Sequence, residues 1–243
     1  MAETGQTYVL LHGAWHGGWC WRFVAHDLRG RGHRVFTPTQ TGVGERKHLL
    51  TPDITQETFV QDLLNVLEME ELAQVILVGH SFGGLAISGA ADRVPERIRR
   101  LVYLDSVILQ DGQTVFGVLP ADVVAARRKL ALEQGHGVAM PIPPVSAFGI
   151  PEDHPRATWV RRHLTPHPVS TYETPLRLKH PVGNGRPCTY IACTEPFYEP
   201  LAGVREWVKA APGWEWQEIA TGHDAMVTAP EMLTEMLVRI GER

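Results

Sequence analysis

Apolar residues along the chain fall into short continuous runs that are separated by longer stretches of helical periodicity. A continuous apolar run of this length is typical of a strand that is buried on both faces of a parallel sheet. The predicted strands are residues 7–13, 34–39, 74–80, 97–105, 188–194 and 214–221. The second of these ends at Pro38 and the glycines that follow it, which are residues that close a strand.

Between these runs, apolar residues recur at steps of three and four positions, which predicts amphipathic helices. In residues 54–69 this spacing is carried by Phe59, Leu63, Val66 and Leu67. The other predicted helices of the alternating pattern are residues 82–93, 201–211 and 230–242. Strands that alternate with helices indicate an α/β fold, in which a mostly parallel sheet is flanked by helices on both faces.

Residues 107–186 interrupt this alternation. The segment is rich in proline and histidine, contains helical stretches at 121–135 and 156–164, and has no convincing buried strand. A disordered loop is the alternative, but the leucines, the valines and Trp159 of this segment need a surface to pack on. The predicted organisation is a core of residues 1–106 and 187–243 with an inserted helical cap of residues 107–186.

Composition narrows the class of protein. Of the 243 residues, 44% are hydrophobic and 21% are charged, as in an ordinary globular protein. The net charge of −4 provides no attraction to nucleic acid or to an anionic membrane. The three cysteines lack a framework spacing, and the N-terminus has neither a basic region nor a long apolar run. We therefore expect a cytoplasmic protein without a nucleic-acid or membrane partner, and the sequence leaves open whether it forms a homodimer.

A serine stands between glycines where the third apolar run meets a helix, in the sequence VILVGHSFGG at 75–84. A strand-to-helix turn of this kind holds the serine in a strained conformation and needs small neighbours, here Gly79 and Gly83. The start of the following helix directs free N–H groups at negative charge formed beside Ser81. An ordinary turn with incidental glycines is the alternative, but the strand and helix on either side favour a nucleophile at Ser81.

A nucleophilic serine needs a base and an acid, which follow it in the order acid, then histidine, in proteins with this turn. Among the 12 histidines, His223 alone lies between the last predicted strand and the last predicted helix, where the base is expected. Two carboxylates are candidates for the acid: Asp105 at a strand end, and Glu195 in a loop with two prolines. Either carboxylate can instead cap a helix or face solvent. The rigid position of a strand end slightly favours Asp105.

The loop after the first strand reads HGAWHGGW at 12–19. Acyl transfer needs a second N–H donor for the oxyanion besides that of Phe82, and this loop is the expected source. We expect the N–H of Ala14 to serve, with Trp15 as the second choice. The glycines do not form G-x-G-x-x-G, so nucleotide binding is not indicated. No histidine pair has the spacing of metal ligands with supporting cysteines or carboxylates, so no metal is expected.

With these motifs the chain resembles the α/β-hydrolase superfamily, and within it the group of plant methyl-salicylate-type esterases, hydroxynitrile lyases and small bacterial esterases. The resemblance is carried by LLHGAWHGGWCW, VILVGHSFGG, CTYIACTE and TGHDAMVTAPEML. Within the group the chain is similar to bacterial hydrolases that include a carbendazim-cleaving carbamate esterase. The resemblance implies an α/β-hydrolase fold with an inserted helical cap.

Two departures from this group bear on the reaction. Its lyases carry a threonine directly after the first-strand histidine and a lysine directly after the catalytic histidine, where this chain has Gly13 and Asp224. Without the lysine no cation stabilises a departing cyanide, so the resemblance implies an esterase rather than a lyase. The plant esterases carry their acid at the position held here by Pro196, which is a second reason to favour Asp105.

The expected reaction is transfer of an acyl group from a small-molecule ester to Ser81 and then to water, without a cofactor. We expect Trp15, Phe82 and Trp159 to line an apolar pocket for an aromatic or alkyl ester. The same triad can cleave a carbamate or an amide, because pocket shape and leaving-group protonation decide between these bonds. A receptor that binds a small molecule with little turnover is the alternative from another class.

Overall fold

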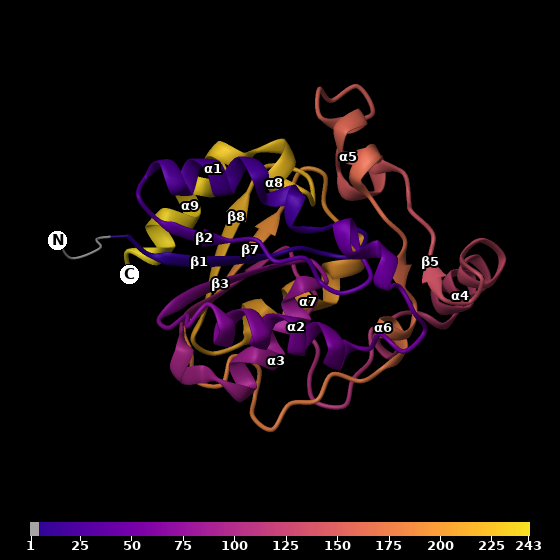
Figure 1. The fold of residues 1–243 in the computed structure, drawn as a ribbon, viewed down its shortest axis with the longest axis horizontal. Coiled ribbons are helices and arrows are strands. Elements are labelled where there is room, and N and C mark those ends of the chain that lie inside the picture. The colour runs from indigo at the N-terminus through magenta and orange to yellow at the C-terminus, as the bar shows by residue number, and fades with distance from the viewer. Residues whose placement is uncertain (1–4) are drawn as a thin grey trace.

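The computed structural model describes residues 5–243 (Figure 1). Residues 1–4, which begin both the predicted core and the N-terminal stretch without a basic region, lie outside the described residues. The main sheet consists of β1 (Thr7–Leu11), β2 (Arg34–Phe36), β3 (Val75–His80), β4 (Ile98–Leu104), β7 (Cys188–Cys193) and β8 (Trp214–Ile219). Its order is β2-β1-β3-β4-β7-β8, and every neighbouring pair is parallel. The predicted mostly parallel sheet is confirmed.

The central strands are apolar because both of their faces are covered. Every residue of β3 and β7 is buried, whereas most residues of the edge strand β8 are only half-buried. At the other edge, β2 ends at Phe36, although the sequence predicts a strand over 34–39. Pro38 has no N–H to donate to a neighbouring strand, so pairing stops before it.

Helices cover both faces of this sheet, as predicted. They are α1 (Arg22–Gly30), α2 (Gln56–Met69), α3 (Gly83–Arg93), α7 (Ala202–Ala210), α8 (Ala225–Thr228) and α9 (Pro230–Gly241). Helix α2 begins with a capping box, in which Thr55 and Thr58 exchange hydrogen bonds between side chain and backbone. Helix α1 is not among the predicted elements. Within residues 5–243, every helix is too short or too polar to cross a lipid bilayer.

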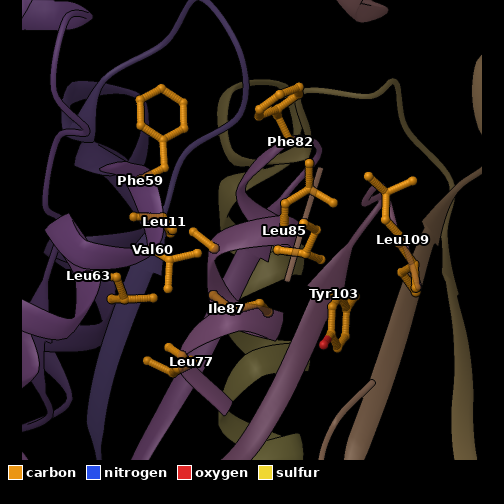
Figure 2. Close-up of a cluster of buried hydrophobic side chains, with 14 of the residues drawn as sticks. Leu11, Phe59, Val60, Leu63, Leu77, Phe82, Leu85, Ile87, Tyr103 and Leu109 are labelled. Carbon is orange, nitrogen blue, oxygen red and sulfur yellow. The ribbon is translucent and has the colours of Figure 1, made fainter. Parts of the chain in front are cut away.

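Two separate hydrophobic cores hold the layers together. On one face α2 packs on α3, where Leu63 and Ile87 join Leu77 of β3 in one cluster (Figure 2). On the other face α1 packs on α9, and Leu28 and Leu237 belong to the core there. Because both faces are filled, the carboxyl ends of the strands are fixed in position, and side chains placed there share one rigid edge.

The helices and short strands of the segment between β4 and β7 lie beside the sheet, on the right in Figure 1. Its elements are α4 (Ala121–Gly135), β5 (Ala139–Met140), α5 (Ala157–His163), β6 (His167–Pro168) and α6 (Ser170–Glu173). Strands β5 and β6 form an antiparallel pair of two residues each, too short for the sequence pattern to reveal. Phe148 and Val160 of this segment belong to the same core as α1 and α9. That residues 107–186 form a cap distinct from the core stays a prediction.

Candidate active site

Ser81 stands in a turn that only small neighbours permit. It follows β3 directly and has a φ of 51°, in the left-handed region. A Cβ at Gly79 would lie 2.9 Å from the backbone of Gly83, and a Cβ at Gly83 would lie 2.7 Å from the carbonyl oxygen of His12. The close approach of helix α3 to the sheet therefore requires both glycines. The hydroxyl of Ser106 donates to the carbonyl of Ser81 at 2.7 Å and helps to hold the turn.

His223 connects Ser81 to a buried carboxylate. Its Nε2 lies 2.9 Å from Oγ of Ser81, and its Nδ1 lies 2.7 Å from Oδ2 of Asp105. An ionised carboxylate only accepts, so Nδ1 carries the proton and Nε2 accepts the hydrogen bond of the Ser81 hydroxyl. Asp105 has no exposed surface and directly follows β4 with a φ of 41°. Three side chains from three different loops thus form one hydrogen-bonded line.

The structure separates the two candidate acids. Strand β4 neighbours β3 in the sheet, and the N–H of Ser81 donates to the carbonyl of Leu104 at 3.0 Å, so the end of β4 lies beside the serine. Glu195 is exposed, and its backbone N–H donates to the carbonyl of Thr221 at 3.0 Å. Of the two carboxylates, only that of Asp105 is within hydrogen-bonding distance of His223 in the described part of the chain.

Asp105 is itself held by a buried arginine that is not among the sequence-based predictions. Nη2 of Arg205 donates to Oδ1 of Asp105 at 2.7 Å and to the carbonyl of Cys193 at 2.6 Å, and the Arg205 side chain is 4% exposed. Arg205 lies on the apolar stripe of α7 between Leu201 and Val208, a position where a charged residue signals a buried partner. We call Ser81, His223, Asp105 and Arg205 the buried relay.

Ala14 and Phe82 both line the cavity that opens beside Ser81, and within residues 5–243 the backbone N–H of neither residue has a hydrogen-bond acceptor. The N–H of Trp15, the second choice for the oxyanion donor, already donates to Nδ1 of His167 at 3.3 Å. Burial lowers the pKa of His167 well below its usual value, so this ring is neutral and able to accept.

His16 and Asp224, the residue after His223, form a buried ion pair. Nε2 of His16 is 2.9 Å from Oδ2 of Asp224, and Nδ1 of His16 is 2.7 Å from the carbonyl oxygen of Ala14. Both partners are acceptors, so both ring nitrogens carry a proton and His16 is a cation. Burial opposes this charge, but the Asp224 carboxylate and the Ala14 carbonyl outweigh it and raise the pKa of His16. This pair is not among the sequence-based predictions.

His80 lies between this pair and His223. Its Nε2 donates to the carbonyl of His223 at 3.0 Å, and the centroids of the two rings are 4.6 Å apart. Burial, reinforced by the neighbouring histidines, lowers the pKa of His80 well below its usual value. A neutral His80 therefore supports the His223 backbone without adding a charge.

A cavity of about 320 Å³ opens beside Ser81. Apolar and aromatic side chains dominate its walls, among them Trp15, Phe82, Tyr172, Tyr198 and Trp207. Among the described residues that line it, Arg127 is the only charged one. The volume and the lining are typical of a site for a small, largely apolar molecule.

Of the two tryptophans expected in this cavity, Trp15 lines it and Trp159 does not. The ring of Trp159 meets Trp19 at 5.1 Å and Phe23 at 5.4 Å between ring centroids. The reason is that α5 packs on the side of the sheet that carries α1, where Trp159 packs against the core of α1 and α9. The prediction for Trp159 is therefore wrong.

The described residues, 5–243, include no cluster of three or more His, Cys, Asp or Glu side chains able to hold a metal ion. Comparison with known proteins gives the family: residues 8–235 match the alpha/beta hydrolase family. The chain belongs to this family. The expected α/β-hydrolase fold and the resemblance to its esterases are thereby confirmed.

Three known proteins illustrate what this chain is similar to. The carbendazim hydrolyzing esterase of Nocardioides sp. (strain SG-4G) is 40% identical over 242 residues, which cover 96% of this chain and 99% of that protein. Methylesterase 9 of Arabidopsis thaliana is 40% identical over 100 residues, 41% of this chain and 39% of that protein. An extracellular alpha/beta-hydrolase from a Paenibacillus species superimposes with a TM-score of 0.81 at 25% identity, covering 98% of this chain and 100% of that one. This chain is thus an esterase-type hydrolase of that fold.

Proposed function

We propose that the protein is a serine hydrolase that cleaves a small aromatic or apolar carboxylic ester through an acyl-enzyme on Ser81. The observation that carries this proposal is the line from Oγ of Ser81 through His223 to the carboxylate of Asp105, with distances of 2.9 and 2.7 Å. A serine, a histidine and a buried carboxylate in this geometry form the arrangement that activates a hydroxyl as a nucleophile.

In the first step, Oγ of Ser81 attacks the carbonyl carbon of the ester while its proton moves to Nε2 of His223. The negative charge of the tetrahedral intermediate is received by the N–H groups of Phe82 and Ala14. A donor placed in this way stabilises the transition state by about 3 kcal/mol in comparable enzymes.

The intermediate then collapses as the bond to the leaving alcohol breaks and His223 donates its proton to that oxygen. A water molecule attacks the acyl-enzyme by the same route, with His223 as the base, and releases the acid. Throughout, Asp105 keeps the Nδ1 proton in place and offsets the charge that forms on the imidazole.

A methyl carbamate is the second candidate substrate. It is favoured by the similarity, over nearly the full length, to a protein named for hydrolysis of carbendazim, which is a methyl carbamate. The triad chemistry is the same for both bonds, so cavity shape and protonation of the leaving group decide between them. The largely apolar lining of the cavity supports either substrate when its acyl or leaving group is aromatic.

Turnover of p-nitrophenyl acetate, p-nitrophenyl benzoate and carbendazim by the purified protein tests the proposal, with a fluorophosphonate label located by mass spectrometry. We expect ester turnover and labelling of Ser81, and the loss of both in Ser81→Ala. The matched control is Ser146→Ala, the same change at an exposed position, which should keep full activity.

Preference for carbendazim over the esters would select the carbamate as substrate. Turnover that persists in Ser81→Ala would overturn the acyl-enzyme on Ser81. Tight binding of substrate with neither turnover nor label would instead indicate a small-molecule receptor.

A further inference from the structure

Two consecutive aromatic residues contact the buried relay: Tyr198 lies against His223, and Phe197 lies against Arg205. The ring of Tyr198 lies on the imidazole of His223, with 4.1 Å between centroids and 18° between planes. The guanidinium carbon of Arg205 lies 4.2 Å from the ring centroid of Phe197. The loop that contains Glu195, whose carboxylate does not reach His223, thus presents two aromatic faces to the site.

The charges around Asp105 explain why an aromatic face matters here. Arg205 is a permanent cation, and its hydrogen bond already pairs it with Asp105 inside the protein. When His223 takes the proton of Ser81, two cations share this one carboxylate. The imidazolium is then only partly compensated by Asp105, in a site from which water is largely excluded.

The other groups that face His223 do not supply the missing compensation. Those from the elements packed around it are Ser81, His80, Cys193, Asp224 and, across the cavity, Arg127. His80 is neutral, and the charge of Asp224 is paired with the cation of His16. Arg127 is a further cation. What remains is the electron-rich face of Tyr198, which attracts a cation placed over it.

We propose that Tyr198 is a positioning residue that stabilises the imidazolium form of His223 through its ring face. The ring face of Phe197 stabilises the guanidinium of Arg205 in the same way. This inference rests on the proposed function of Ser81 and His223. The active part of Tyr198 is the ring and not the hydroxyl, because the contact with His223 is a parallel stack.

The test compares Tyr198→Leu with Tyr198→Phe by measuring kcat and KM for p-nitrophenyl acetate across pH. In Tyr198→Leu we expect kcat to fall about 5- to 30-fold, and the acidic limb of the kcat/KM profile to move about 0.5 to 1 unit to lower pH. The sign follows because the ring favours the protonated form of the base, so that its removal leaves the base deprotonated to a lower pH. Tyr198→Phe keeps the ring and should stay within about twofold of wild type.

Trp207→Leu is the matched control, because it removes an aromatic ring from the cavity at a position other than that of Tyr198. It should raise KM and leave the acidic limb unchanged. Melting temperatures of all variants show whether each is folded. An unshifted acidic limb in a folded Tyr198→Leu, or an equal loss in Tyr198→Phe, would overturn the inference. Failure of the proposed function is a different result: wild type itself would show no turnover that depends on Ser81.

Discussion

His16 and Asp224 form an ion pair that solvent does not reach: Nε2 of His16 lies 2.9 Å from Oδ2 of Asp224, and the side chains are 1% and 0% exposed. His16 belongs to the loop after β1, and Asp224 directly follows His223. The pair therefore ties the loop of the proposed oxyanion donor Ala14 to the loop of the proposed base.

Asp224→Asn is expected to destabilise the fold and to weaken catalysis. Removing one partner of a buried pair leaves the other charge uncompensated, which costs about 3 kcal/mol of the free energy of unfolding. Urea unfolding near neutral pH measures this loss, and Asp53→Asn is the control at an exposed carboxylate. If both variants lost the same small amount, the His16 charge would not depend on Asp224.

A pair of carboxylate substitutions tests which acid serves His223. Asp105→Asn is expected to lower kcat/KM by about 10⁴-fold, because an amide permits the wrong tautomer of the imidazole. Glu195→Gln should change it by less than about twofold, because that side chain is exposed. Asp105→Asn also leaves the buried charge of Arg205 without its carboxylate, which destabilises the fold. The double variant with Arg205→Met removes both charges, so that a loss of activity can be told from a loss of stability. A larger loss in Glu195→Gln than in Asp105→Asn would reverse the assignment.

Stability should fall when the solution is made acidic, because three histidines are buried in the neutral form. Burial lowers the pKa of His12 to about 3 and lowers the pKa of His80 and His167 well below the ordinary value of 6.5. The unfolded chain takes up protons near pH 6.5 and the folded chain does not. Each ring therefore contributes stability that is present above pH 6.5 and is lost as the pH falls, by about 1.4 kcal/mol per pH unit.

His16 acts in the opposite direction. Its pKa is raised in the folded protein, so its contribution is complete below pH 6.5 and is lost as the pH rises through the folded value. Urea unfolding between about pH 5 and about pH 9 measures how the free energy of unfolding falls on the acidic side and on the alkaline side. Asp224→Asn should reduce the fall on the alkaline side. A His12 ring that titrates near 6.5 by NMR in the folded protein would contradict the acidic limb.

Glycine substitutions test the packing of the Ser81 turn. Gly79→Ala places a Cβ 2.9 Å from the backbone of Gly83, so we expect a loss of about 1 to 3 kcal/mol and a larger loss of kcat. Gly30→Ala meets no atom within 4 Å at the end of α1 and should be neutral or more stable by up to about 1 kcal/mol. Thermal unfolding and ester turnover of the two variants provide the comparison. Equal behaviour of both would show that the turn tolerates a side chain.

Long-range contacts decided what the sequence left open. Asp105 lies 100 residues from Arg205 and 118 residues from His223 along the chain, so no local sequence pattern predicts either contact. The choice against Glu195 follows from the order of strands, which puts the end of β4 beside the Ser81 turn. Trp159 does not line the cavity because of the face of the sheet on which α5 packs.

By itself the sequence determined the parallel sheet, most of its helices, and the loops that carry Ser81 and His223. These features follow from neighbouring residues: continuous apolar runs make buried strands, three- and four-residue spacing makes helices, and glycines beside a serine permit the left-handed turn. Only the tertiary structure decided which carboxylate meets His223, that Arg205 and the pair of His16 and Asp224 are buried charges, and which aromatic rings face the cavity. Charge pairing and ring stacking depend on distances of a few ångströms between remote segments, and strand order and layer packing set those distances.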